Sequence, residues 1–145
     1  MKVADLLKSK GQTVITVSPD EPVFQAMGKL IDNKIGSLLV TDVENKIVGI
    51  ISERDIMRAA YSDYDLLKTK KVSQLMSTNI IVAIPDDDID YIMGIMTQNR
   101  IRHLPIVTRE TIVGMISIGD IVKFQLEEIQ VKNRYLEEYM YGQTL

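Results

Sequence analysis

The sequence contains Gly49-Ile50-Ile51-Ser52-Glu53-Arg54-Asp55-Ile56, and the same pattern returns as Gly114-Met115-Ile116-Ser117-Ile118-Gly119-Asp120-Ile121. The segments upstream also match, since Pro19-Asp20 in the first copy corresponds to Pro85-Asp86 in the second. Self-similarity at a fixed offset indicates two copies of one structural unit, and such units bury their apolar faces against each other. Function is therefore expected where the two copies meet.

The composition is that of a globular protein, because hydrophobic residues make up 46% and charged residues 26% of the 145 positions. Cysteine is absent, which excludes disulfides and thiolate metal sites. The sequence shows no apolar run of about 20 residues and no secretory signal. We therefore expect a cytoplasmic protein with no membrane partner. The net charge of -3 argues against a nucleic-acid partner, and no motif predicts a metal site.

Each copy predicts the order strand, helix, strand, strand, helix. In the first copy we expect strands at 14–17, 37–41 and 46–51, a helix that starts at 18–21 with Ser18 as its cap, and a helix from 52. In the second copy we expect strands at 80–83, 102–107 and 111–116, a helix at 88–98, and a last helix from 117 to about 141 that Gly142 ends. Short lead-in segments precede each copy at 3–7 and 72–76, and 61–71 is a linker. This alternation predicts an α/β sandwich.

The repeated motif at 49–56 and 114–121 lies in two repeated strand-helix units, and the second unit contains Ile101-Arg102-His103-Leu104-Pro105. This arrangement resembles a CBS domain pair, also called a Bateman module. The resemblance implies a mixed α/β (α+β) fold of two tandem β-α-β-β-α repeats in one pseudo-twofold sandwich. It assigns 1–66, with the lead-in helix, to the first repeat, 67–125 to the second, and 126–145 to a helical extension.

The same resemblance implies a regulatory module rather than an enzyme. Its two clefts bind adenosine-containing ligands, namely AMP, ADP, ATP, S-adenosylmethionine or NAD(H), as regulatory ligands, and it requires no cofactor. It also implies a disc-like homodimer and a separate effector protein. The alternative is a module for dimerisation or protein interaction that binds no ligand.

Ser52-x-x-Asp55 and Ser117-x-x-Asp120 each lie where a strand meets a helix. A carboxylate there can accept hydrogen bonds from ribose hydroxyls, and the free N–H groups of the helix start favour anions. The alternative is a helix cap, although the capping box prefers Glu or Gln over Asp at the third position. The resemblance favours the ribose interpretation.

The resemblance places two further groups at the clefts. Arg102 and His103 would line the Asp120 cleft, where Arg can hold a phosphate, and the alternative is that they are a surface charge and a turn residue. Gly36 and Ser37 occupy the matching place in the Asp55 cleft, which is less basic. We therefore expect the Asp120 cleft to prefer the phosphorylated ligand.

Each cleft is also expected to borrow apolar residues from the other repeat. Val14 and Ile15 would wall the adenine in the Asp120 cleft, and Ile80 and Ile81 would do so in the Asp55 cleft. The alternative is that these four residues belong to the ordinary core.

The last helix carries Val122, Leu126, Ile129, Leu136 and Met140 at heptad-like spacing, with Asn133 at the missing place. Either this helix packs against its mate in a homodimer or against an effector, or it folds back over its own sandwich. The sequence leaves both alternatives open.

Overall fold

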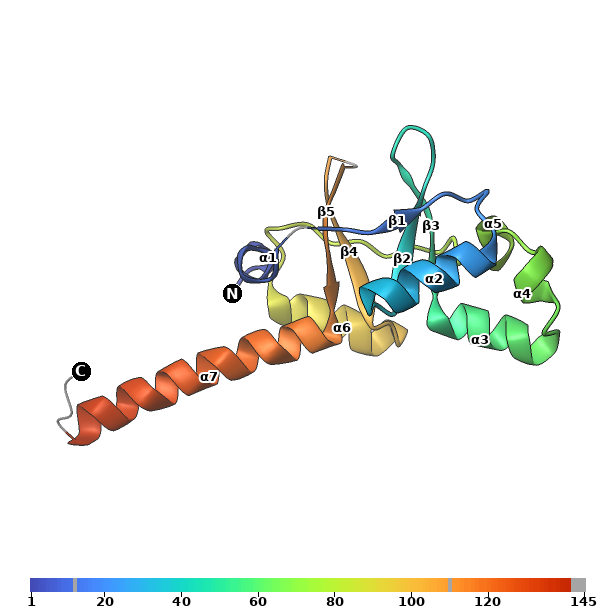
Figure 1. Cartoon of the computed structure of the whole chain (residues 1–145). Coiled ribbons are helices and arrows are strands. Elements are labelled where there is room, and N and C mark those ends of the chain that lie inside the picture. The colour runs from blue at the N-terminus through green and yellow to red at the C-terminus, as the bar shows by residue number, and fades with distance from the viewer. Residues whose placement is uncertain (12, 110, 142–145) are drawn as a thin grey trace.

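The computed structural model describes residues 1–11, 13–109 and 111–141. Two repeats lie side by side, each with a β-hairpin on one side and helices beneath it, and one long helix leaves the body (Figure 1). The expected mixed α/β fold of two tandem repeats is confirmed.

The first repeat consists of β1 (Thr16–Val17), α2 (Val23–Asn33), β2 (Ser37–Thr41), β3 (Ile47–Ser52) and α3 (Glu53–Ser62). β2 pairs with β1 in parallel and with β3 in an antiparallel ladder, so it lies in the middle of the sheet and is buried along its length. The turn between β2 and β3 is fixed by Asp42, whose Oδ1 accepts hydrogen bonds from the N–H groups of Glu44 and Lys46.

The second repeat consists of α6 (Ile89–Asn99), β4 (His103–Thr108), β5 (Thr111–Ser117) and α7 (Ile118–Tyr141). The strand expected at 80–83 was wrong, because this segment makes only an isolated parallel bridge, Ala83 to Ile106. Ala83 N–H donates to Pro105 O at 3.0 Å. Pro105 itself has no N–H, so the ladder cannot continue upstream along β4.

The start of α2 also differs from the expectation. The helix begins at Val23 after Pro22, and Ser18 does not cap it; the Ser18 Oγ instead accepts a bond from Asp20 N–H at 3.3 Å in a turn. Pro22 is held extended by a bridge to Lys71, in which Val23 N–H donates to Lys70 O at 3.0 Å. Backbone pairing with a distant segment therefore delays the helix.

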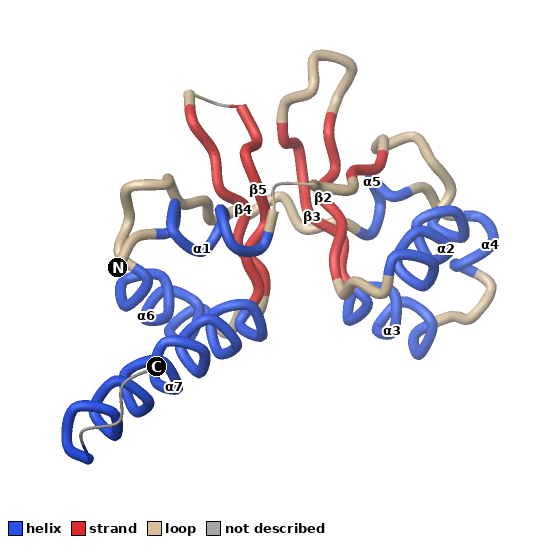
Figure 2. The backbone as a smooth tube through the Cα atoms, turned by 60° about the vertical axis from the view of Figure 1, so that its left-hand side comes forward, coloured by secondary structure: helices blue, strands red, loops and turns tan. Residues whose placement is uncertain are grey.

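The two lead-in helices are exchanged between the repeats. α1 (Val3–Lys10) places Val3, Leu6 and Leu7 in the core of the second repeat. α5 (Val72–Leu75) places Val72 in the core of the first repeat. Figure 2 shows the exchange, with α1 beside α6 and β5, and α5 beside α2. The predicted linker contains a further short helix, α4 (Leu66–Thr69), which packs on α2 and α3.

α7 keeps only its first turns on the body, through Ile121 and Phe124, and then runs outward (Figures 1 and 2). The alternative in which this helix folds back over its own sandwich is therefore wrong for the described residues. Gly142, predicted to end the helix, lies outside the described residues.

The glycine of each repeated phrase makes room for the exchanged lead-in segment. A Cβ at Gly114 would lie 2.6 Å from Leu7 Cδ2, and a Cβ at Gly49 would lie 3.1 Å from the carbonyl oxygen of Ser77. Both positions are buried in the hairpins. The glycines are required because the lead-in segments pass directly over the strands.

We expect Gly114→Ala to lower the free energy of unfolding by about 1–3 kcal/mol, because the added methyl group forces the tightly packed Leu7 side chain to shift within the core. Gly94→Ala is the control, because a Cβ at this exposed position inside α6 meets nothing within 4 Å. The control should raise stability by about 0.5–1 kcal/mol. Thermal unfolding of both variants measures the difference, and a stabilised Gly114→Ala would contradict the packing described above.

Candidate functional site

The Ser52-x-x-Asp55 motif is a helix cap at the junction of β3 and α3. Asp55 N–H donates to Ser52 Oγ at 3.3 Å, and Ser52 N–H donates to Asp55 Oδ2 at 2.9 Å. Ser52 Oγ also donates to Oδ2 at 3.0 Å. These bonds hold the carboxylate in a fixed position and leave Oδ1 without a hydrogen bond to the described residues. The cap and a ribose acceptor are therefore compatible roles.

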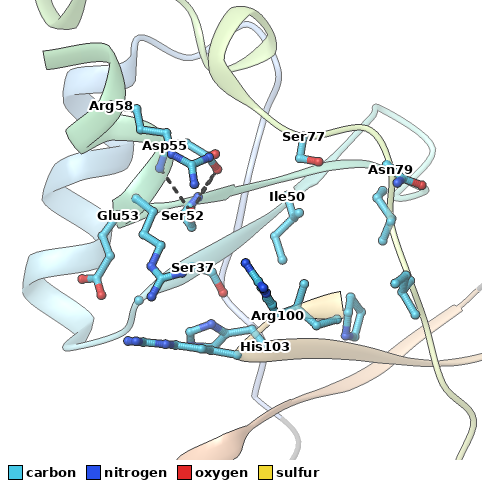
Figure 3. A pocket seen from close by; sticks show the side chains of 17 residues that line it. Ser37, Ile50, Ser52, Glu53, Asp55, Arg58, Ser77, Asn79, Arg100 and His103 are labelled. Carbon is cyan, nitrogen blue, oxygen red and sulfur yellow. Dashed lines mark hydrogen bonds between the residues drawn. The ribbon is translucent and has the colours of Figure 1, made fainter. Parts of the chain in front are cut away.

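Asp55 lines a pocket of about 240 Å³ between the two repeats. Figure 3 shows Ser52 and Asp55 at the start of α3 on one side, His103 and Arg100 on the opposite side, and Ser77 and Asn79 along a third. The wall combines three kinds of side chain. The apolar residues are Ile50, Ile80, Ile81, Ile101 and Pro105; the cationic ones are Arg54, Arg58, Arg100 and Arg102; the small polar ones are Ser37, Ser77 and Asn79.

Asp120 lines a second pocket, of about 300 Å³, together with Ser117, Val14 and Ile15. Its cap repeats the first, with Ser117 N–H donating to Asp120 Oδ2 at 2.9 Å. Here, however, Lys10 from the end of α1 lies 2.6 Å from the same oxygen and also donates to the carbonyl of Met115. The Asp120 carboxylate is thus already paired within the chain.

Burial of the Asp120 carboxylate would by itself raise its pKa. The hydrogen bonds from Lys10 and Ser117 lower the pKa by more, so the pKa of Asp120 lies below its usual value. The carboxylate is therefore ionised at neutral pH and bound to an ammonium group. A ribose hydroxyl that approached Asp120 would compete with Lys10.

Eleven of the twelve residues expected at the clefts line the pocket to which they were assigned. All six assigned to the Asp55 cleft line its pocket: Ser52, Asp55, Gly36, Ser37, Ile80 and Ile81. Five of those assigned to the Asp120 cleft line the second pocket: Ser117, Asp120, His103, Ile15 and Val14.

Arg102 instead lines the Asp55 pocket. It precedes β4, which starts at His103, and its carbonyl oxygen accepts a bond from Ile118 N–H at 3.0 Å. Successive side chains of an extended chain point to opposite sides. Arg102 therefore lies on the side of the Asp55 pocket, whereas His103 lies between the pockets and lines both.

The distribution of cations is opposite to the expected one. Four arginines line the Asp55 pocket, whereas Lys10 and Lys34 line the Asp120 pocket and Lys10 is already paired. The sequence alone did not identify Arg54, Arg58 and Arg100 as pocket residues. Their spacing offered one signal, because Arg54 and Arg58 lie one helical turn apart beside Asp55.

Ser37 is the polar residue between the two pockets. It is 5% exposed and lines both pockets, and its Oγ has no hydrogen-bond partner among the described residues. Buried hydroxyl groups are nearly always hydrogen-bonded. An unpaired hydroxyl at this place favours a pocket that is completed by a bound molecule.

His103 is half-buried, and burial lowers the pKa of its imidazole below 6.5, more than the nearby carboxylate of Glu53 raises it. The imidazole is therefore neutral at physiological pH. In that form one ring nitrogen donates and the other accepts a hydrogen bond.

The CBS domain pattern matches residues 3–62 and 72–127, which include both repeats. The chain belongs to the CBS domain family. It is 30% identical over 148 residues to the CBS domain-containing protein CBSX3, mitochondrial, of Arabidopsis thaliana, across 97% of this chain and 72% of that protein. The resemblance carried by the doubled motif is confirmed, and the chain is a CBS pair, a regulatory module.

Solved structures of CBS pairs superpose closely on the chain. The CBS-domain containing protein ATU1752 from Agrobacterium tumefaciens is 38% identical with a TM-score of 0.81, covering 84% of this chain and 91% of that chain. The CBS domain pair of protein MJ0100, solved with 5-methylthioadenosine and S-adenosyl-L-methionine, is 26% identical with a TM-score of 0.77, covering 88% and 98%. Within the described residues of this chain, none of the helices has the length and apolar character needed to cross a membrane.

The lowered pKa of His103 predicts a pH dependence of stability. Between 6.5 and the lower pKa of the folded state, the unfolded chain binds a proton that the folded chain does not. The stability that neutral His103 confers is therefore fully present above pH 6.5 and is lost as the pH falls below it. His103→Gln removes this loss, so the melting temperature of the variant should fall less between about pH 7.5 and about pH 5.5. Calorimetry measures both slopes, and equal slopes would contradict the assignment.

Proposed function

We propose that this CBS pair is a regulatory sensor that binds an adenosine-containing nucleotide in the Asp55 pocket and transmits its presence to a separate effector protein. The observation that carries the proposal is the composition of that pocket. A carboxylate fixed at a helix start, an apolar wall and four arginines line one cavity of about 240 Å³. These are the groups that a ribose, a purine and a phosphate require.

The proposed pose follows from these three kinds of side chain. The Asp55 carboxylate accepts hydrogen bonds from the ribose hydroxyls through its unpaired Oδ1. Ile50, Ile80 and Ile81 pack against the faces of the adenine, and the arginines hold the phosphates. Ser37, whose Oγ lacks a partner among the described residues, is placed to bond the ligand.

Charge decides among the adenosine ligands. S-adenosylmethionine, which was bound to the MJ0100 pair, carries a positive sulfonium group. Four arginines in the Asp55 pocket outnumber Glu53 and Asp55, so a cationic ligand is repelled and an anionic one is attracted. We therefore expect AMP, ADP or ATP to bind more tightly than S-adenosylmethionine. NAD(H) is disfavoured because the cavity is small for a dinucleotide.

The proposed role is binding and not catalysis, with no cofactor required. The chain has a single histidine and no cysteine, and that histidine is shared by the two pockets. We propose that the CBS pair acts as a cytoplasmic homodimer, with neither nucleic acid nor a membrane as its partner. The net charge of -3 supports the exclusion of nucleic acid.

One observation favours the alternative of a ligand-free interaction module. Lys10 pairs with Asp120 and so supplies from within the chain the charge that a ligand would otherwise meet. If the Asp55 pocket also proves unable to bind nucleotides, both clefts serve only to join the repeats. The two functions are separated by nucleotide titration.

We expect one nucleotide to bind per chain, and Asp55→Asn to abolish this binding. The amide keeps an oxygen for the N–H of Ser52 but removes the negative charge. The matched control is Asp120→Asn in the second pocket, which should leave the stoichiometry and affinity unchanged. Isothermal titration with AMP, ADP and ATP measures both, and a nucleotide at 100 times its dissociation constant adds about 2.7 kcal/mol of stability. Absence of binding to all three would overturn the sensor and favour the interaction module.

Arg100→Gln should reduce the affinity for ADP by about tenfold or more, because a charge-assisted hydrogen bond contributes about 1.5–3 kcal/mol. The affinity for adenosine, which lacks phosphate, should change little. Arg109→Gln is the control, since Arg109 is exposed and does not line the pocket. Equal losses for ADP and adenosine would show that Arg100 does not contact the phosphates.

A further inference from the structure

Beyond Gln125, whose Nε2 donates to Met93 Sδ at 3.5 Å, α7 leaves the body of the described chain. Ile121 and Phe124 anchor the first turns on the second core, and the helix then runs away from both repeats (Figures 1 and 2). At 1.5 Å per residue, residues 125–141 extend about 25 Å. A free helix of this length is marginal in water unless one of its faces is covered.

One face of α7 is regular and apolar along its whole length. The seam consists of Val122, Leu126, Ile129, Leu136 and Met140, whose side chains are between 47% and 73% exposed. Asn133 occupies the position between Ile129 and Leu136, so the series follows the alternating steps of four and three residues of a coiled coil. Ile121 and Phe124 face the body of the protein. Because successive residues are rotated by about 100° around the helix axis, Val122 and the rest of the seam face away from the body.

The polar residues of this face identify the partner. In the heptad, Leu126, Asn133 and Met140 share the a position, while Val122, Ile129 and Leu136 share the d position. A single Asn at an a position pairs with its own copy in a parallel two-stranded coiled coil, at some loss of stability. Lys132 and Glu137 then fall at the flanking g and e positions, which face each other across a parallel pair.

We propose that residues 122–140 form a parallel coiled coil with the same helix of a second copy of this chain. The inference deepens the proposed homodimeric state of the CBS pair and rests on it, but it does not depend on nucleotide binding. Because the seam points away from the body, the two bodies lie on the outer sides of the helix pair. Lys132 of each chain pairs with Glu137 of the other, and the two Asn133 side chains bond to each other within the seam.

An antiparallel pair fits these residues less well. It would place e positions opposite e positions and g opposite g. When residues 122–140 of the two helices overlap fully, Lys132 faces Lys132, a like-charge pair, and Asn133 packs against Ile129 instead of its own copy. The position of Asn133 therefore favours the parallel arrangement.

The first experiment is the molar mass of the full chain by light scattering at micromolar concentration. The wild type should have twice the 16.4 kDa of one chain. The double variant Ile129→Glu with Leu136→Glu should weaken the dimer by at least about a hundredfold, because it buries four carboxylates in the seam. Both side chains are exposed in the single chain, so the fold is retained.

The matched control is Val131→Glu with Tyr135→Glu, which changes two exposed hydrophobic residues of α7 at the f and c positions, off the seam. The control should remain dimeric. A monomeric wild type would overturn both the pairing and the homodimer. A dimer that survives the seam variant, or that the control disrupts equally, would overturn the seam alone. Nucleotide titration of the same variants tests the Asp55 pocket separately.

A charge exchange separates self-pairing from docking of another protein. Lys132→Glu and Glu137→Lys should each weaken the dimer by about tenfold, and the combination of both should restore it, because each chain supplies both charges. Failure of the double exchange to restore the dimer would overturn the parallel register.

The absence of cysteine allows a test of direction. Met140→Cys at the far end of α7 should form a disulfide-linked dimer on mild oxidation, since a parallel pair brings the two copies of position 140 together. Val131→Cys, off the seam, should cross-link far more slowly. Equal cross-linking of the two variants would overturn the parallel arrangement.

Discussion

The structure depends on the exchange of the two lead-in helices between the repeats. Leu7 from α1 enters the second core over Gly114, and the segment after α5 passes over Gly49, where Ile50 and Ser77 exchange backbone hydrogen bonds of 2.9 Å in both directions. The second core is completed by α1 from the N-terminal end of the chain, and the first core by α5 from the segment that leads into the second repeat. Neither repeat can therefore bury its apolar surface alone, and the two clefts between them are held in a fixed relation.

The exchange also makes the two clefts chemically different. The first lead-in ends at Lys10, which reaches Asp120, whereas the second continues through Ser77 and Asn79, which line the Asp55 pocket with neutral groups. Both clefts keep the same Ser-x-x-Asp cap. The lead-in segments, rather than the repeated motif, thus determine which carboxylate is paired within the chain and which retains an oxygen free of bonds to the described residues.

The repeat and the caps were predictable from the sequence because they depend on local patterns. The helix start at Ser52 and the strand at residues 37–41 follow from adjacent residues. Predictions from local patterns failed where pairing with a distant segment of backbone determines the structure. The bridge to Lys71 holds Pro22 extended and delays α2, and Pro105 prevents a strand at 80–83. The charge of each pocket was not predictable for the same reason. Lys10 and Arg102 reach their pockets through the packing of whole elements, and Arg102 lines the Asp55 pocket alone, whereas His103 lines both pockets.

The Asp120 pocket is directly connected to the long helix, because Asp120 is the third residue of α7. A rigid helix of 24 residues is about 36 Å long, so a tilt of about 5° at its start moves its far end by about 3 Å. Such a displacement is comparable to the reach of a side-chain contact. A bound ligand can shift α7 from the position described here only if it binds more tightly when the helix is displaced. His103 and Ser37 line both pockets, so they connect the Asp55 pocket to the cleft at which this helix begins.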